Sequence, residues 1–252
     1  LLAGISAYRW LKNDRAKDVM ASLRTGVMVA AVLIPVQIVV GDLHGLNTLK
    51  YQPAKLAAME GIWETQKGVP AVLFAIPDQA TQSNRYEIAI PKLASFYLTH
   101  DWNGEVKGIK EFGDQHPPVG PVFWAFRIMV GVGLLMLAVS WFASYEMRFK
   151  DGLSRRTAMV LVAMTFAGWV ALVSGWYVTE IGRQPWLVHG VLTTAQAASQ
   201  VPAGNIALSL AMYLTLYAAL LSAYVSVVFN LAKKAVYGGY ELSGDLKGMC
   251  HA

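Results

Sequence analysis

The fold class follows from the stretch Gly175-Trp176-Tyr177-Val178-Thr179-Glu180-Ile181-Gly182-Arg183-Gln184-Pro185-Trp186, where a carboxylate and a guanidinium end a long apolar segment. On a helix, Trp176, Glu180 and Arg183 share one face. Burying the acid is costly unless an opposite charge or a metal compensates it. Two interpretations therefore stay open: an ion pair between Glu180 and Arg183 at a lipid interface, and a site at which Glu180 meets a bound metal.

Composition places the chain among membrane proteins. Apolar residues make up 55% of the 252 residues, charged residues only 15%, and the mean hydropathy is +0.41. These values are too apolar for a soluble domain of this size. The single cysteine, Cys250, excludes a disulfide framework and a thiolate cluster for iron–sulfur or zinc. The net charge of +5 comes from short basic clusters beside apolar segments, which argues against a nucleic-acid partner.

Four segments are long enough to cross a bilayer, which requires about 20 apolar residues. We predict spans at residues 22–40, 121–145, 157–180 and 205–231. The apolar run at residues 1–10 is too short to span, and we expect it to be the end of a fifth helix that is truncated upstream, so that the chain is a fragment. The predicted fold class is all-α, a polytopic transmembrane helix bundle.

Basic residues predict the orientation of these spans. They crowd three segments: Arg9, Lys12, Arg15, Lys17 and Arg24; then Arg148, Lys150, Arg155 and Arg156; then Lys233 and Lys234. By the positive-inside rule, these segments are cytoplasmic. We therefore divide the chain into a helix end, cytoplasmic loop and first span at residues 1–40, an extracytoplasmic loop at 41–120, and three transmembrane helices with a cytoplasmic tail at 121–252.

The outer loop contains one well-defined element near its start. Pro53 suits the first position of a helix, and apolar side chains recur at helical spacing at Leu56, Met59, Ile62 and Trp63. This pattern predicts a short amphipathic helix. Lys55 and Glu60 are five residues apart and so do not form a simple intrahelical pair. Spacing alone favours a solvated face for both charges.

The second span carries a charge of its own. Arg127 lies about two turns inside a helix whose outer end is near Pro121, so it needs an anion such as a carboxylate or a cofactor propionate. Met129 lies nearly opposite on this helix, on a face with Val132, Gly133 and Met136. Small residues there would admit a flat ligand or another helix. A membrane methionine is usually packing material, and spacing does not separate this role from metal ligation.

Five sequence blocks occur in order between and within the predicted spans. They are Gly41-Asp42-Leu43-His44-Gly45, Gln52-Pro53-Ala54-Lys55-Leu56-Ala57-Ala58-Met59-Glu60, Trp63-Glu64-Thr65, Phe126-Arg127-Ile128-Met129-Val130, and Gly175-Trp176 with Gly182-Arg183-Gln184-Pro185-Trp186. Together they resemble subunit I of cytochrome bd-type quinol oxidases along the whole chain. The short connection from Gly108-Ile109-Lys110-Glu111-Phe112 to the second span resembles the short-loop, cyanide-insensitive branch of that family.

The resemblance implies a haem-containing terminal oxidase of the bacterial cytoplasmic (inner) membrane. Such an enzyme oxidises quinol at the outer face and reduces O2 to water, and it generates a proton gradient without pumping. The implied cofactors are a low-spin haem b, a high-spin haem b, and a haem d or a further haem b. The implied partners are subunit II, small single-span subunits and membrane lipid, with quinol and O2 as substrates.

The resemblance also carries over two iron ligands. Met129 matches the axial methionine of the low-spin haem b iron, and Glu180 matches the glutamate at the high-spin haem b iron. A thioether is a soft, neutral ligand that raises the potential of a haem, which suits a site that receives electrons from quinol.

Five further positions match family residues near the substrate and the haems. Lys55 and Glu60 match the charged pair of quinol oxidation in the outer loop. Arg127 and Arg183 match arginines near the haems, where a guanidinium pairs naturally with a propionate. Trp176 matches an aromatic residue between the haem groups. The charged, aromatic and methionine positions that stand out in the helical pattern thus coincide with the matched family positions.

Some features depart from the family or fit other classes. The family's histidine ligands and the acids of its proton pathway belong to the first half of the subunit, which this sequence lacks. The histidines of this chain, most of them in predicted loops, favour solvated or capping roles: His44, His100, His116, His189 and His251.

Two other classes of membrane protein are weighed against the resemblance. A secondary transporter would show broken helices or paired repeats, which the four predicted spans do not clearly show. A structural assembly subunit would tolerate loss of the charged residues, and an absorption spectrum separates both classes from a haem oxidase.

Overall fold

The computed structural model describes residues 1–150 and 152–248, with side chains up to residue 227. Cys250 and His251, which were named from the sequence, lie outside the described residues. The chain divides into two compact units, Leu1–Ala197 and Ala198–Ala252, and each is described by itself. The second unit consists of the long helix α9 (Ala203–Gly248).

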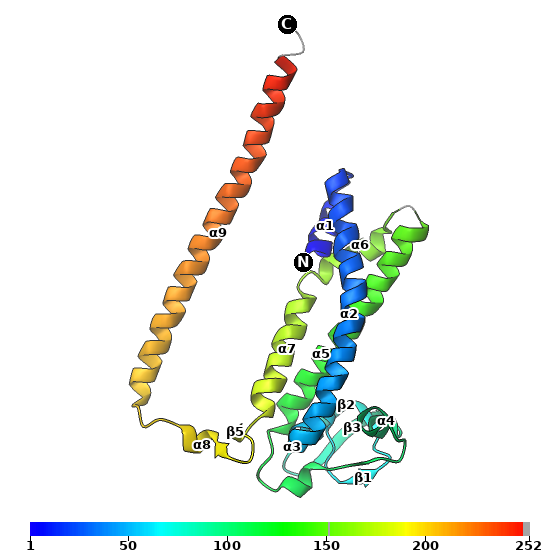
Figure 1. Cartoon of the computed structure of the whole chain (residues 1–252), viewed down its shortest axis with the longest axis vertical. Coiled ribbons are helices and arrows are strands. Elements are labelled where there is room, and N and C mark those ends of the chain that lie inside the picture. The colour runs from blue at the N-terminus through cyan, green and yellow to red at the C-terminus, as the bar shows by residue number, and fades with distance from the viewer. Residues whose placement is uncertain (151, 249–252) are drawn as a thin grey trace. The chain divides into compact units, whose positions relative to one another are not determined.

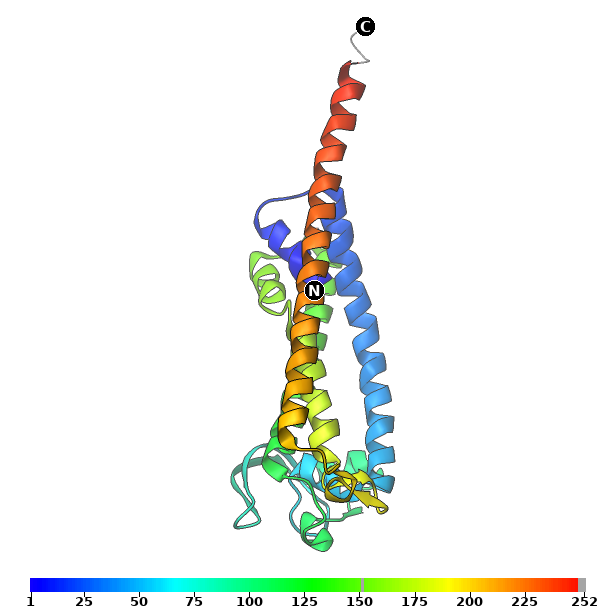
Figure 2. The same ribbon diagram turned by 90° about the vertical axis from the view of Figure 1, so that its left-hand side faces the viewer.

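The transmembrane helix bundle predicted from the sequence is confirmed. Four helical segments are long and apolar enough to cross a membrane: Lys17–Tyr51, Val119–Phe149, Arg155–Gly182 and Ala203–Val227. In the first unit, α2 (Lys17–Tyr51), α5 (Val119–Phe149) and α7 (Ala167–Gly182) pack along one another, and α1 (Leu2–Leu11) packs on α2 and α6 (Arg155–Ala163) (Figure 1). Figure 2 shows the same helices from the side, with the outer-loop elements gathered at one end of α2, α5 and α7.

The first span extends beyond its predicted end. Helix α2 continues past residue 40 to Tyr51, so that Gly41, His44 and Gly45 belong to the helix and not to a loop. Glycine in a helix costs about 1 kcal/mol, which a long packed helix tolerates. The helix stops at Gln52, which adopts φ −138° and ψ 59°, because the residue before a proline avoids the α-helical region.

The predicted span at residues 157–180 is confirmed as Arg155–Gly182, but a turn interrupts its helix. Helix α6 ends at Ala163 and α7 begins at Ala167, with a turn between them. In this turn the Thr165 hydroxyl donates to the Val162 carbonyl at 2.6 Å, and its side chain lies directly against Gly4 of α1. A side-chain hydrogen bond to the backbone competes with the helical one, and the contact with α1 stabilises the break.

The outer loop contains strands as well as the predicted helix. After α3 (Pro53–Glu60) come β1 (Gln66–Lys67), β2 (Ala71–Asp78), β3 (Ser83–Ile90), α4 (Leu93–Thr99), β4 (Glu105–Val106) and a 3-10 helix, η1 (Ile109–Phe112). The antiparallel pairs are β1 with β4 and β2 with β3. Neither pair was predicted from the sequence: β2 and β3 form a hairpin, whereas β1 and β4 are distant in the chain. A second hairpin, β5 (Trp186–Val188) with β6 (Leu192–Thr193), and the short α8 (Thr194–Ala197) follow α7.

Helix α3 lies in a crowded position that fixes both of its ends. Pro53 starts it, as predicted, and Gly61 ends it with φ +70°. A Cβ atom at Gly61 would lie 3.1 Å from the Phe123 ring of α5, so that both the left-handed backbone and the close contact favour glycine. Every residue from Ala54 to Glu60 is buried. This burial determines the environment of the charged side chains on α3.

Candidate functional site

The charges of the spanning helices bound an uncharged stretch on each of them. Between the basic clusters that are predicted to be cytoplasmic and Asp42 on α2, Arg127 on α5 or Glu180 on α7, the helices carry no charge. On α5 the uncharged stretch runs from residue 128 to 145, which is about 27 Å at 1.5 Å per residue and close to the thickness of the hydrocarbon layer. Arg127 therefore lies at the edge of the hydrocarbon, and the outer loop packs upon it.

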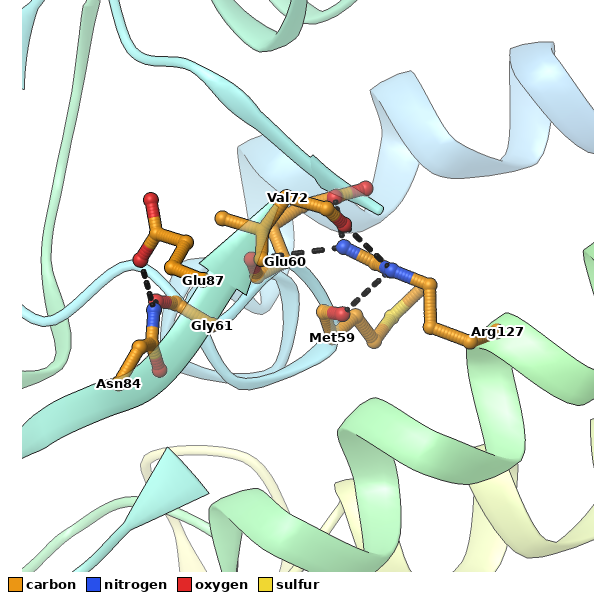
Figure 3. Close-up of polar contacts among 7 residues, drawn as sticks. All are labelled: Met59, Glu60, Gly61, Val72, Asn84, Glu87 and Arg127. Atoms are coloured by element: carbon orange, nitrogen blue, oxygen red, sulfur yellow. Dashed lines mark hydrogen bonds and ion pairs between the residues drawn. The ribbon is translucent and has the colours of Figure 1, made fainter. Parts of the chain in front are cut away.

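Arg127 binds Glu60, as Figure 3 shows. Its Nη2 lies 3.0 Å from the Glu60 Oε2, its Nη1 donates to the Met59 carbonyl at 2.9 Å, and its Nε donates to the Val72 carbonyl at 2.7 Å. The side chains of Arg127 and Glu60 are only 14% and 4% exposed. The prediction that Arg127 needs an anion is confirmed, and in this structure the anion is a carboxylate.

The prediction of a solvated face for Lys55 and Glu60 was wrong. Lys55 is 8% exposed and Glu60 is 3% exposed. Helix α3 contacts α2, α5, α7 and η1, so that no side of it is left to water. The sequence pattern describes one apolar face of this helix, whereas its tertiary position covers the polar face as well.

Tyr97 on α4 is a further member of the Glu60 cluster. The pKa of Tyr97 is raised above its ordinary value, first because burial disfavours the phenolate, and then because of the charge of Glu60 and a hydrogen bond to it. The phenol therefore stays protonated beside the carboxylate. Tyr97 was not predicted as a site residue, because no spacing rule in the sequence connects α4 to α3.

Lys55 of α3 lies against α7, whereas Glu60 of the same helix meets α5. The Lys55 stem covers Gly182, where a Cβ atom would lie 3.1 Å from the Lys55 Cγ and Cε. The pKa of Lys55 is lowered chiefly because burial disfavours the ammonium; nearby Glu180 opposes this effect and Arg183 reinforces it. Among the described side chains, no carboxylate lies within 4 Å of its ammonium. Lys55 and Glu60 therefore point into two different clusters.

The ion pair between Glu180 and Arg183 is confirmed. The Arg183 Nη2 lies 2.7 Å from the Glu180 Oε2, and both side chains are 40% exposed. The Nε of Arg183 is buried and has no hydrogen-bond partner in the described part of the chain. Arg183 thus keeps one donor for a second anion.

A cavity of about 230 Å³ joins these residues at the outer end of α7. Basic, amide and aromatic side chains line it, among them Gln52, Lys55, Gln115, Arg183, Trp186 and His189. Lys55 supplies it with a partly desolvated ammonium, and Gln52 and Gln115 supply amide donors and acceptors. The cavity therefore offers a cation and several hydrogen-bonding groups to a small polar ligand.

Met129 and Trp176 lie farther down α5 and α7. A Cβ atom at Gly175 of α7 would lie 2.9 Å from the Met129 Sδ, and one at Gly168 would lie 3.9 Å from the Met136 Cε. Two methionines of α5, Met129 and Met136, therefore face two glycines of the antiparallel α7. Trp176 is 60% exposed and stacks on Tyr177 at 6.0 Å between ring centroids. The structure thus does not bring Trp176 into the Lys55 cluster.

The described residues contain no group of three His, Cys, Asp or Glu side chains placed to hold a metal ion. An iron bound here would therefore need a macrocycle or ligands from other chain segments, together with single protein ligands such as Met129 or Glu180. The donor types present fit a haem: a soft thioether, a carboxylate, and the free Nε of Arg183 for a propionate.

Comparisons with known proteins agree on one family. The family model described as cytochrome bd terminal oxidase subunit I matches residues 1–236. The cytochrome bd ubiquinol oxidase subunit 1 of Bacillus subtilis (strain 168) is 32% identical over 247 residues, which cover 92% of this chain and 53% of that protein. The cytochrome bd-II ubiquinol oxidase subunit 1 of Escherichia coli (strain K12) is 27% identical over 300 residues, covering 92% and 58%.

Structural comparison gives the same result. The structure of bd oxidase from Geobacillus thermodenitrificans matches with a TM-score of 0.81 and 28% sequence identity, over 92% of this chain and 54% of that chain. The chain spans about half the length of the curated relatives it matches.

Proposed function

Because this chain belongs to the cytochrome bd terminal oxidase subunit I family, we propose that it forms part of a quinol:oxygen oxidoreductase, which oxidises quinol at the outer membrane face and reduces O2 to water. The observation that carries the proposal is the cavity at the outer end of α7, where the buried ammonium of Lys55 lies beside Arg183. This cavity lies at the membrane edge, which a lipid-soluble quinol reaches directly from the bilayer.

Lys55 orients the quinol ring in this proposal. A lowered pKa allows the Lys55 ammonium to give up and regain its proton more readily than an exposed lysine. The amides of Gln52 and Gln115 offer hydrogen bonds to ring oxygens from the same cavity. At about 230 Å³ the cavity is smaller than typical drug-binding pockets, which suits a quinol headgroup whose isoprenoid tail stays in the lipid.

Glu60 is the proposed proton acceptor. The Arg127 guanidinium compensates its negative charge in a buried environment, which makes an ionised carboxylate tolerable there. The Tyr97 phenol, whose pKa is raised by burial and by the charge of Glu60, remains protonated near the same carboxylate. Protons taken from quinol at this level leave to the outside, while the oxygen-reducing site takes its protons from the cytoplasm. Charge is then separated without a pump.

The chain's own residues suggest how haem is held. In this proposal Met129 would supply a thioether ligand to the iron of a low-spin haem b, and Glu180 would supply a carboxylate to the iron of a high-spin haem b. Arg183, with its free Nε, would pair with a haem propionate. Arg127, whose guanidinium already binds the Glu60 carboxylate, would lie near a haem as a second cation. Trp176, on α7 between Gly175 and Glu180, would serve as an electron-transfer contact. Haem, when bound, would carry electrons from quinol toward oxygen at a site that holds a haem d or a further haem b.

The exposed apolar side of α7 supports a larger complex in a bacterial cytoplasmic membrane. Trp169, Leu172 and Trp176 are 57%, 65% and 60% exposed. Side chains of this size need lipid or other helices around them. We propose that subunit II, small single-span subunits and lipid supply this cover. The break between α6 and α7 is a feature expected of transporters, but family membership favours the oxidase.

The proposal is tested by replacing Lys55 in the complete oxidase. Lys55→Gln should lower the rate of quinol oxidation by about tenfold or more, because the charged group that orients the ring is lost, and the haem absorption spectrum should stay the same. The matched control is Lys50→Gln, since Lys50 is exposed at the end of α2, where its ammonium lies over the Tyr51 ring. Wild-type kcat/KM for quinol in Lys55→Gln would remove Lys55 from the reaction.

A further inference from the structure

The hairpin formed by β2 and β3 exposes an unusual amount of apolar surface for a loop outside the membrane. Six large apolar side chains are between 42% and 79% exposed: Leu73, Phe74, Ile76, Tyr86, Ile88 and Ile90. Behind them, Val72 and Ala75 are buried against Phe123 of α5. Monomeric soluble domains rarely leave such a contiguous patch uncovered.

The hairpin is fixed to the body of the protein on its other side. The Val72 carbonyl accepts from the Arg127 Nε at 2.7 Å. Asn84 of β3 donates to the Gly61 carbonyl at 2.9 Å and accepts from the Trp63 indole at 2.8 Å. Figure 3 shows Val72 at the Arg127 guanidinium, and Asn84 farther along the hairpin beside Gly61 and Glu87. Because both strands are anchored in this way, the exposed side of the hairpin has a fixed orientation.

The depth of the hairpin along α5 decides which environment its exposed side meets. Arg127 lies eight residues, about 12 Å, below the first residue of α5. Below Arg127 the uncharged stretch of α5 begins, and above it Trp124 packs edge-on against Phe74 at 5.3 Å between ring centroids. The strand β2 therefore lies beside the outer two turns of α5, at the edge of the hydrocarbon layer and not far above it.

The chemistry of the patch fits a lipid surface. Phe74 of the patch packs on Trp124 of α5, and Ile128, one turn farther along the same face of α5, is 43% exposed. The turn of the hairpin, by contrast, is polar, with exposed Gln79, Thr81, Gln82 and Ser83, and the charge of Arg85 is compensated by Asp78. Tyr86 and the stacked, exposed pair Phe96 and Trp102 add the aromatic side chains that gather at membrane interfaces.

From this continuity we propose that the exposed side of the β2–β3 hairpin rests in the boundary between headgroups and acyl chains of the outer leaflet, as a membrane-interface anchor. The polar turn then remains in the headgroup layer or in water. The anchored hairpin holds the Val72 carbonyl against Arg127, so that the lipid surface supports the pair formed by Arg127 and Glu60.

The test uses the complete oxidase in phospholipid nanodiscs, in a Cys250→Ser background without other reactive cysteines. A bimane label is placed at Ile88→Cys, on the apolar side, or at Gln79→Cys in the turn. Phospholipids that carry a nitroxide near the headgroup or deep in the acyl chain quench labels in lipid, and aqueous iodide quenches labels in water. Both variants must retain wild-type quinol oxidation, which shows that the labelled protein is folded.

We expect headgroup-proximal nitroxide lipid to quench the Ile88 label by about half or more, because an interfacial element is buried about 5–10 Å into this boundary. The Gln79 label should respond to iodide instead. Quenching of the Ile88 label by iodide alone would show a water-facing hairpin and overturn the proposal. Protection from both quenchers would also overturn it, since a protein segment would then cover the patch.

Discussion

Arg127 and Glu60 are 67 residues apart in the sequence, yet the Arg127 Nη2 lies 3.0 Å from the Glu60 Oε2 at the outer edge of the membrane-embedded region. The pair links α5 to the end of α3, and the further bond of Arg127 to Val72 links both to β2. One guanidinium thus joins a spanning helix to the outer loop. This junction determines how rigidly the proposed proton acceptor is held.

Breaking this junction should destabilise the protein markedly. Glu60→Gln leaves the Arg127 charge buried without its anion, which costs about 3–5 kcal/mol. The thermal midpoint of the purified oxidase should fall accordingly. As a control, Asp78→Asn removes the partner of the exposed Arg85 and should cost less than about 1 kcal/mol. Equal losses in the two variants would contradict a structural role for the buried pair.

Met129 and Met136 offer a matched comparison of ligation with packing. Both contact a glycine of α7, so that Met→Leu, a nearly isosteric change, costs each about 1.5 kcal/mol or less. Only Met129→Leu should convert the low-spin haem to high spin or lose it, because leucine cannot ligate iron. The measurement is the reduced absorption band of the low-spin haem. An unchanged band in Met129→Leu would leave Met129 as packing material alone.

Glu180 is in an ion pair with Arg183, and the proposed iron ligation goes beyond that pair. Glu180→Gln keeps a hydrogen bond, but it replaces an anionic carboxylate by a neutral amide, which is a much poorer iron ligand. High-spin haem b should therefore be depleted while the haem at Met129 remains. The double variant Glu180→Gln with Arg183→Gln relieves the ion pair symmetrically but restores no ligand. High-spin haem content, measured by spectroscopy, should therefore be no higher in the double variant. Full recovery there would favour the ion pair as the only role.

Lys55 should make the folded protein less stable at neutral pH than near its ordinary pKa. Because the folded-state pKa of Lys55 lies below the ordinary value of 10.5, the unfolded state binds more protons between the two values, and stability rises with pH through that window. Lys55→Met removes this cost. The thermal midpoint of Lys55→Met should exceed that of the wild type at pH 7, and the difference should shrink toward pH 10.5. A difference in thermal midpoint that does not change with pH would contradict a lowered pKa of Lys55.

The sequence predicted a large part of the fold because bilayer thickness imposes a length and a composition on each span. The four spans, the short helix beginning at Pro53 and the ion pair between Glu180 and Arg183 all depend on neighbours within one helix. The hairpin β2–β3, in contrast, was not predicted. Its register pairs Val72 with Ala89 and depends on packing against Phe123 of a distant helix.

The candidate site divides in the same way. Its residues were recognised from their types and order in the chain, since a charge or a methionine at the end of an apolar segment is conspicuous in one dimension. The partners of these residues were not. Spacing favoured a solvated face for Lys55 and Glu60, and it gave no sign of Tyr97, because burial of a short helix on all sides comes from elements far away in the sequence.

The sequence by itself determined that this protein is a bundle of membrane-spanning helices and where its charged residues stand along them, because the bilayer excludes unpaired polar groups from about 20 residues at a time. Only the tertiary structure decided that Glu60 meets Arg127 while Lys55 meets α7, and that a span breaks where Thr165 contacts Gly4. The physical reason is that the partner of a buried charge is set by which helices and strands pack together, and helical periodicity carries no information about elements that are distant in the chain.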